Sequence, residues 1–330
     1  MKHLTYLEHD GADDRTIYIS CSSSKEFVLP LTVMLGSLFA HVDRSWKVVV
    51  YIFDGGMRTS DRNRMLRSLN TKNADIKFLK IRDHAQLKGL ETEGHFSIAS
   101  SYRVIGTMML PKSITKVIHL DSDVILSEDI SKLWSVDIGE NYVLAVQEQG
   151  KDHQYVSSKG GMVHYRRFGI DPGTKYFNAG IMVINLEKWR QDSIAERTID
   201  FMRENIKYIQ WYDQDALNVV LANKWGELDH RWNLLTQIFS NSGWEEGPLE
   251  SEKKYRELVE HPYIIHFNTP GKPWHFDDVH PYRNLFIENL KKTRWYWTWK
   301  LQMWKSCFVK YLLPRGFTRF VKKMLLSKNY

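Results

Sequence analysis

The amino-acid sequence predicts an α/β fold with a largely parallel sheet flanked by helices, and three observations support this fold class. The first third of the chain alternates short β-rich runs with helical patterns, as in βαβ units. The composition, with 43% hydrophobic and 26% charged residues, is that of a globular protein and excludes a disordered or collagen-like chain. The length of 330 residues suits about two domains, or one large α/β domain with an appendage.

The expected elements follow one another along the chain. Strands are predicted, from their β-branched and aromatic residues, at 16–21, 46–53, 75–81, 116–120, 176–184 and 263–267. Helices are predicted, from apolar spacing and capping residues, at 28–41, 59–70, 99–109, 192–206 and 213–223. Two segments with little periodicity, 147–175 and 240–258, are predicted to be functional loops.

Charge is distributed unevenly along the chain. The net charge is +7, but residues 291–330 hold eleven Lys and Arg and no Asp or Glu, so residues 1–290 carry a net charge of −4. A mildly acidic body argues against a nucleic-acid-binding core and assigns the basic charge to the tail. The two cysteines, Cys21 and Cys307, exclude a disulfide scaffold and a cysteine zinc site, which fits a reducing compartment.

The N-terminus and the hydropathy pattern indicate where the protein resides. Residues 1–10 lack the apolar segment of a signal peptide. No stretch reaches the roughly 18 uncharged apolar residues of a membrane span. We therefore expect a cytoplasmic protein that is neither exported by a signal peptide nor integral to the membrane.

Two aspartates follow the strand predicted at 116–120. Asp121 and Asp123 stand where that strand ends, and in open α/β sheets ligands bind beyond the carboxyl ends of the strands. Mg²⁺ and Mn²⁺ prefer oxygen ligands, commonly one or two carboxylates together with substrate phosphate oxygens. The pattern therefore indicates a divalent-metal site, and the alternative is an acidic polar turn without a ligand.

Further polar residues stand at the ends of other predicted elements. His266 offers an imidazole ligand suited to Mn²⁺, and Gly271 with Lys272 can set a backbone and an ammonium against phosphate. The alternatives are an ordinary hydrogen-bonded histidine and a solvated lysine. In the segment 213–215, helix capping explains at least one of the two aspartates but does not require Gln214.

Together these segments resemble glycosyltransferase family 8, retaining enzymes that use nucleotide sugars and that include bacterial lipopolysaccharide galactosyl- and glucosyltransferases and the glycogenins. The resemblance covers about residues 15–290 and rests on Ser101-Tyr102-Arg103, HLDSDV, YFNAGIMVINLEKWR, YDQDALN and HFNTPGKPWH. It implies the GT-A fold, with a Rossmann-like mixed sheet flanked by helices. The implied catalytic domain is 1–290, with a nucleotide-sugar half at about 15–150 and an acceptor half at about 151–290.

The resemblance also implies a metal and a phosphate site. Asp121, Asp123 and His266 would bind Mn²⁺, or Mg²⁺ in its stead, which would bridge the diphosphate of a UDP-sugar. Lys272, with Gly271, would contact that diphosphate. Where many members have glycine three residues after the histidine, this chain has threonine, and its glycine is displaced to position 271.

The donor sugar is expected to lie among a second set of residues. Arg103, Asn178, Asp213 and Gln214 match family positions around the donor sugar and its anomeric carbon. Asp213, Gln214 and Asp215 are the expected catalytic residues, which would position and polarise the donor.

The uracil is expected to be held differently from many family members. Those members often carry an acidic Asp-Asn-Tyr-like run after the first strand, whereas this chain has CSSSKEF at 21–27. Nucleotide contacts are therefore expected from the Ser22 hydroxyl, the Phe27 ring and Ser122.

The expected function is retaining transfer of galactose or glucose from a UDP-hexose to a glycan or glycolipid acceptor, such as a lipopolysaccharide or a cell-surface polysaccharide. Retention of configuration at the anomeric carbon can come from double displacement or from same-face attack. The poor nucleophilicity of Gln214 favours same-face attack. The alternative functions are nucleotide-sugar binding without turnover and association with nucleic acid through the basic tail.

The tail, 291–330, is expected to lie on an anionic membrane surface. One helical face is predicted to carry Trp297, Leu301, Trp304, Phe308 and Tyr311, flanked by Lys300 and Lys305, with Trp295 and Trp299 pointing elsewhere. A second amphipathic pattern follows at 317–325. Such helices insert aromatic side chains at the headgroup boundary, which would attach the protein peripherally to the inner face of the cytoplasmic membrane. The alternative is that the first helix packs on the catalytic body.

Overall fold

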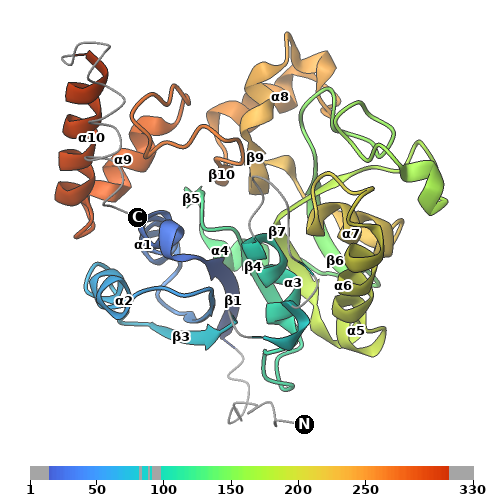
Figure 1. Cartoon of the computed structure of the whole chain (residues 1–330), viewed down its shortest axis with the longest axis horizontal. Helices are drawn as coiled ribbons and strands as arrows, with labels where there is room; N and C mark the ends of the chain where they lie inside the picture. The colour runs from blue at the N-terminus through green and yellow to red at the C-terminus, as the bar shows by residue number, and fades with distance from the viewer. Residues whose placement is uncertain (1–14, 82–83, 88–89, 91–97, 312–330) are drawn as a thin grey trace.

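The computed structural model describes residues 15–81, 84–87, 90 and 98–311 (Figure 1). These residues form a seven-stranded sheet and a three-stranded sheet, both packed against helices. The amphipathic pattern predicted at 317–325 and the side chain of Tyr311 lie outside what the structure describes.

The larger sheet is mixed, with the strand order β3-β2-β1-β4-β7-β6-β8. Its members are β1 (Thr16–Ser23), β2 (Lys47–Asp54), β3 (Ala74–Lys80), β4 (Lys116–Leu120), β6 (Val143–Gln147), β7 (Phe177–Asn185) and β8 (Trp225–Glu227). β1 pairs in parallel with β2 and β4, and β2 pairs in parallel with β3, as expected of βαβ units. β7 runs antiparallel between β4 and β6, which makes the sheet mixed and confirms the predicted fold class.

Helices cover both faces of this sheet, so its central strands are apolar on both sides. In β2, Val48 and Val50 belong to the core under α1 (Val28–His41) and α2 (Thr59–Leu66). Val49 and Tyr51 belong to the core on the opposite face. That face is covered by α3 (Tyr102–Thr107), α5 (Leu186–Gln191), α6 (Ile194–Asn205) and α7 (Asp213–Val220).

The smaller sheet joins segments that are far apart in the sequence. Its strands, in the order β5-β10-β9, are β5 (Val124–Leu126), β10 (Ile264–His266) and β9 (Leu234–Leu235). β10 runs antiparallel to β5, and His266 pairs with Val124. This pairing brings His266 beside the residue that follows Asp123.

Several helices are shorter than predicted. The helix predicted at 192–206 begins after Ser193, whose left-handed φ of 50° separates α5 from α6. The helix predicted at 99–109 is α-helical only in α3 and is preceded by a 3-10 turn. The remaining helices are α4 (Ile130–Trp134), α8 (Glu252–Glu260), α9 (Arg283–Lys291) and α10 (Tyr296–Tyr311). The 3-10 turns are Lys25–Phe27, Ala85–Leu87, Ile98–Ser101, Tyr165–Phe168, His230–Asn233, Thr236–Ser240 and Trp244–Glu246.

The two predicted loops differ in the structure. Residues 148–175 are irregular apart from the 3-10 turn Tyr165–Phe168 and a single bridge between Tyr155 and Lys175. The loop predicted at 240–258 is wrong in its second half, because α8 begins at Glu252. Ser251 caps this helix, and its hydroxyl accepts a hydrogen bond from the Lys254 amide at 3.3 Å.

The tail helix α10 packs on the body with one face and exposes the other. Trp295 and Trp299 join the hydrophobic cluster of Phe286, and Trp299 is 7% exposed. Residues on both sides of the domain boundary predicted between 290 and 291 therefore pack in one hydrophobic cluster. The opposite face exposes the predicted stripe, with Trp297 at 72%, Leu301 at 53%, Trp304 at 65% and Phe308 at 39%. Within the described ranges, no helix has the length and apolar content to span a bilayer.

Candidate active site

The acidic pair lies at the junction of the two sheets. The chain leaves β4 at Leu120, passes Asp121 and Asp123, and enters β5. The Asp121 amide donates to the Gly180 carbonyl of β7 at 2.8 Å, and the Asp123 carbonyl accepts from the Phe267 amide at 3.0 Å. These backbone bonds hold both residues at the carboxyl end of β4, where ligands bind in open α/β sheets.

His266 meets the acidic pair because β10 pairs with β5. Its Nε2 lies 3.4 Å from Oδ1 of Asp123 and 3.7 Å from Oδ2 of Asp121. Its Nδ1 lies 3.0 Å from Oδ1 of the buried Asn233. Since an amide oxygen only accepts, this contact assigns the ring proton to Nδ1 and leaves Nε2 as the metal-facing nitrogen.

The donor set of this cluster fits a divalent cation. One ligand atom from each of Asp121, Asp123 and His266 lies within 4.8 Å of the others, and no second cluster of this kind occurs in the part of the chain that the structure describes. Two carboxylates and an imidazole suit Mn²⁺, and carboxylates also suit Mg²⁺. The three ligands predicted from the sequence are thus brought together.

Neighbouring cations keep both carboxylates ionised. Burial would raise the pKa of Asp121, but the Arg103 guanidinium and the His119 ring hold it below its ordinary value. Burial also opposes ionisation of Asp123, and the Lys272 ammonium and His266 hold its pKa well below its usual range. The ionised form is the one that binds a metal.

Arg103 links the acidic pair to the start of α7. Its Nη1 lies 3.2 Å from Oδ1 of Asp121, and its Nε lies 2.7 Å from Oδ2 of Asp213. Nη1 also donates to the Ala179 carbonyl at 2.6 Å. Burial raises the pKa of Asp213 to about 6, a rise that Arg103 opposes and Asp121 reinforces.

Gln214 and Asn178 meet at Glu148, a carboxylate that the sequence analysis did not identify. Its Oε1 accepts from Nδ2 of Asn178 at 2.8 Å and from Nε2 of Gln214 at 3.2 Å. Glu148 is 3% exposed, and its Oε2 is buried without a hydrogen-bond partner among the described residues. Buried oxygens without a partner are uncommon in folded proteins, and a bound ligand, ion or water commonly satisfies them. No local motif distinguishes this residue; only the pairing of β6 with β7 brings it beside Asn178.

Asp215 is engaged away from these residues. Its carboxylate accepts from the Tyr176 hydroxyl at 2.5 Å and from the amides of Gln210 at 2.6 Å and Trp211 at 2.9 Å. These bonds fix the turn before α7, in which Tyr212 has a φ of 49°. The structure shows the Asp215 carboxylate engaged within the fold and absent from the cleft lining, and its catalytic role stays a prediction.

Lys272 reaches the acidic pair from the loop after β10. Its Nζ lies 2.7 Å from Oδ2 of Asp123 and 2.5 Å from the Phe267 carbonyl. Gly271 is exposed in the same loop. An ammonium beside a metal ligand stands where it can pair with the oxygens of a metal-bound diphosphate.

The residues predicted to contact the uridine lie near the ends of β1 and β4, with Ser22 inside β1 and Ser122 after β4. The Ser122 hydroxyl donates to the Ser22 carbonyl, which ties the acidic turn to β1. Phe27 precedes α1, and its ring packs edge-on against Trp274 at a centroid distance of 5.9 Å. The structure thus connects Phe27 to the Lys272 loop.

Most of the side chains around the acidic pair and Glu148 line one cleft of about 190 Å³. The three candidate metal ligands and Arg103 line it together with Glu148, Asn178, Asp213 and Gln214. Its other lining residues, to which the sequence analysis gave no role because they lie in separate segments of the chain, are His153, Gly180, Trp211, Tyr212, Gln237 and Asn268.

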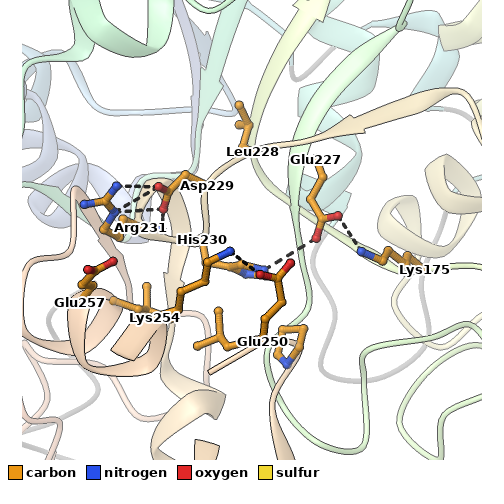
Figure 2. Close-up of a pocket in the computed structure, with 12 residues that line it drawn as sticks. Lys175, Glu227, Leu228, Asp229, His230, Arg231, Glu250, Lys254 and Glu257 are labelled. Carbon is orange, nitrogen blue, oxygen red and sulfur yellow. Dashed lines mark hydrogen bonds and ion pairs between the residues drawn. The ribbon is translucent and has the colours of Figure 1, made fainter. Parts of the chain in front are cut away.

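A larger cleft of about 290 Å³ lies beside α8 (Figure 2). The charged side chains that line it pair with one another. Lys175 contacts Glu227 at 2.6 Å, and Arg231 contacts Asp229 at 2.6 Å. The charged groups of this cleft thus already have partners. In the smaller cleft, several polar side chains point to one place and Glu148 Oε2 lacks a partner among the described residues, so we take the smaller cleft as the candidate active site.

A mixed α/β sheet with an acidic pair and a histidine at its edge is the architecture of the GT-A class of glycosyltransferases. The solved structure of galactosyltransferase LgtC in complex with donor and acceptor sugar analogues has this fold. It superimposes with a TM-score of 0.70 at 22% identity and covers 84% of this chain and 96% of that chain. The sequence model of Glycosyl transferase family 8 matches residues 18–278, and the chain belongs to this family.

Curated relatives cover most of the chain. General stress protein A of Bacillus subtilis is 31% identical over 285 residues, which span 86% of this chain and 96% of the relative. Lipopolysaccharide 1,3-galactosyltransferase of Salmonella typhimurium is 25% identical over 88% of this chain and 82% of the relative. Lipopolysaccharide 1,2-glucosyltransferase of Escherichia coli is 26% identical over 64% of this chain and 60% of the relative.

Proposed function

We propose that this glycosyltransferase is a metal-dependent, retaining hexosyltransferase that moves galactose or glucose from a UDP-sugar to a glycan or glycolipid acceptor. The observation that carries the proposal is the cluster of Asp121, Asp123 and His266 in one cleft, with the Lys272 ammonium 2.7 Å from the Asp123 carboxylate. Mn²⁺ is the proposed ion, with Mg²⁺ as the alternative. The lipopolysaccharide galactosyl- and glucosyltransferases among the relatives support a hexose donor and an acceptor such as a lipopolysaccharide or cell-surface polysaccharide.

The residues around the acidic pair are proposed to bind the diphosphate and to favour its departure. The metal, when held by its three ligands, supplies Lewis acidity to the leaving group. Lys272 adds a positive charge beside Asp123, which stabilises the negative charge that grows on UDP. The Gly271 backbone completes the phosphate contact, and Ser22, Ser122 and Phe27 are proposed to hold the nucleoside.

The donor hexose is proposed to lie between Arg103 and the amides of Asn178 and Gln214. The Gln214 side chain is already oriented, because its Oε1 accepts from the Ala179 amide at 3.0 Å and its Nε2 donates to Glu148. Asp213 acts through its ion pair with Arg103. An amide is a poor nucleophile, so we favour attack by the acceptor on the face from which UDP leaves over double displacement through Gln214.

The acceptor is proposed to be presented at an anionic membrane surface. One face of α10 exposes aromatic and aliphatic side chains, and residues 291–330 carry eleven basic and no acidic residues. Aromatic rings enter the headgroup region, and each Lys or Arg near anionic lipid adds about 1 kcal/mol of attraction. These features support peripheral attachment at the inner face of the cytoplasmic membrane. Within the catalytic domain, we propose a donor half at about 15–150 and an acceptor half at about 151–290.

The two alternative functions would give different experimental results. A nucleotide-sugar-binding protein without turnover would bind UDP and leave UDP-sugars unconsumed. A nucleic-acid-associated protein would bind nucleic acid through its tail more tightly than anionic lipid, with a steep salt dependence. The mildly acidic body and the metal-ligating cleft support the transferase.

The test is a panel of UDP-hexoses assayed for UDP release with Mn²⁺, with Mg²⁺ and with excess chelator. We expect UDP-galactose or UDP-glucose to be consumed with Mn²⁺ and to persist with chelator. Asp123→Asn should lose metal-dependent turnover, whereas Asp137→Asn, a change at an exposed aspartate outside the cleft, should keep it. Full turnover of Asp123→Asn, or turnover that the chelator does not reduce, would contradict the metal-dependent mechanism.

A further inference from the structure

Trp299 connects the tail helix to the loop that carries Lys272. It lies on the buried face of α10, and its indole Nε1 donates to the main-chain carbonyl of Trp274 at 2.9 Å. The two tryptophans are 7% and 6% exposed, respectively. A buried carbonyl without a partner is costly, so this bond restrains the backbone at Trp274. Trp299 lies beyond the catalytic domain expected from the sequence.

Trp274 is part of the turn that presents Lys272. The His275 amide donates to the Lys272 carbonyl at 2.7 Å, which closes the turn. The Trp274 ring packs against Phe27 at 5.9 Å and against Phe286 at 5.4 Å between centroids. Trp274 therefore stands between the tail and two residues assigned to the nucleotide, Lys272 and Phe27.

A second tryptophan holds the same tail at a different place. Nε1 of Trp295 donates to Oγ1 of Thr32 in α1 at 3.1 Å. The Arg64 guanidinium lies 4.4 Å from the centroid of the Trp295 ring and donates to the Arg294 carbonyl at 2.9 Å. The tail thus has two comparable indole bonds, one to α1 and one to the Lys272 turn.

We propose that Trp299 is a positioning residue of the nucleotide site, which holds the Lys272 turn through Trp274 so that the ammonium faces the diphosphate. This rests on the proposed binding of UDP at the same loop. Without the indole N–H, the turn also samples conformations in which Lys272 does not face the diphosphate. The apparent UDP affinity then falls in proportion to the fraction of molecules in which Lys272 does face it. The candidate metal ligands on β10 and after β4 keep their own backbone bonds, so metal affinity should change less than UDP affinity.

The experiment compares Trp299→Phe with the matched control Trp295→Phe. Each variant loses one indole N–H and keeps an aromatic ring. Calorimetric titration with UDP in the presence of Mn²⁺ should give a Kd about three- to tenfold higher for Trp299→Phe and unchanged for Trp295→Phe. Titration with Mn²⁺ alone should give a smaller change in Kd than titration with UDP for Trp299→Phe, and no change for Trp295→Phe. In steady-state kinetics, the donor KM of Trp299→Phe should rise while kcat stays within about twofold.

A double variant tests whether Trp299 acts through Lys272. Adding Trp299→Phe to Lys272→Ala should cause no further loss of UDP affinity, and an additive loss would overturn the proposal. An unchanged Kd in Trp299→Phe, or an equal rise in both tryptophan variants, would also overturn it and leave the proposed function standing. Wild-type protein that fails to bind UDP would instead defeat the proposed function.

Discussion

Gly180 and His266 lie so close that a Cβ on Gly180 would stand 2.3 Å from Cε1 of His266. The same Cβ would lie 2.8 Å from Oδ2 of Asp121. β7 therefore passes directly beside the candidate metal ligands, and this position has room only for a hydrogen. Space, rather than an unusual backbone conformation, accounts for the glycine.

Gly180→Ala should weaken metal binding by at least about tenfold, because the new methyl group displaces the His266 ring from the carboxylates. Titration with Mn²⁺ measures this loss. Gly36→Ala is the matched control, since its Cβ would meet only Leu69 Cδ2 at 3.9 Å, an ordinary contact. Equal Mn²⁺ affinity in the wild type and Gly180→Ala would show that the cluster does not bind metal in this geometry.

Glu148→Gln should lower kcat by about a hundredfold or more, because it removes the negative charge of a buried carboxylate that lines the cleft and binds the amides of Asn178 and Gln214. The variant keeps the size of the side chain and the contacts of Oε1, so Mn²⁺ affinity and the melting temperature should change little. Steady-state UDP release measures the effect. Glu250→Gln, at the second cleft, is the control. If Glu148→Gln turns over at the wild-type rate, the carboxylate serves only the packing of Asn178 and Gln214.

His280 is predicted to make the protein sensitive to acid. Its ring packs against Phe267 at 4.6 Å between centroids, and its Nδ1 accepts from the Tyr282 amide at 3.1 Å. Burial lowers the pKa of His280 from 6.5 to about 4. Between these values the unfolded chain binds a proton that the folded chain does not, so stability is present above pH 6.5 and lost as the pH falls toward 4.

From pH 7 to pH 5, this residue should reduce the free energy of unfolding by about 2 kcal/mol. Urea denaturation at the two pH values measures the change, and His280→Phe should remove this part of it. His261→Phe, at an exposed histidine, is the control. The same pH dependence in the wild type and His280→Phe would refute the assignment.

Truncation of the tail should separate lipid binding from nucleotide binding. A chain that ends at residue 303 keeps Trp295 and Trp299 but loses Trp304, Phe308 and most of the tail's basic residues. It should no longer co-sediment with anionic vesicles and should still release UDP from its donor. A chain that ends at residue 290 also loses Trp299 and should bind UDP more weakly. The membrane anchor is disproved if the 303-residue chain sediments like the full chain, or if the full chain never sediments.

Local patterns in the sequence predicted the fold class and the three candidate metal ligands, which the structure brings together. The apolar run before Asp121 predicts a strand that ends at the acidic pair, and β4 ends there. The apolar spacing from Trp297 to Phe308 likewise predicts the exposed face of α10. These features could be read directly because strand alternation and helical periodicity depend on neighbouring residues.

Only the tertiary structure decided which polar groups share the cleft. Glu148 and Asn178 are 30 positions apart and meet through strand pairing, while Trp299 reaches Trp274 through helix packing. Asp215 stands beside Gln214 in sequence, yet its carboxylate faces Tyr176 instead of the cleft. Side-chain partners of this kind depend on strand register and on the direction in which each side chain leaves the backbone, and neither is contained in a local motif.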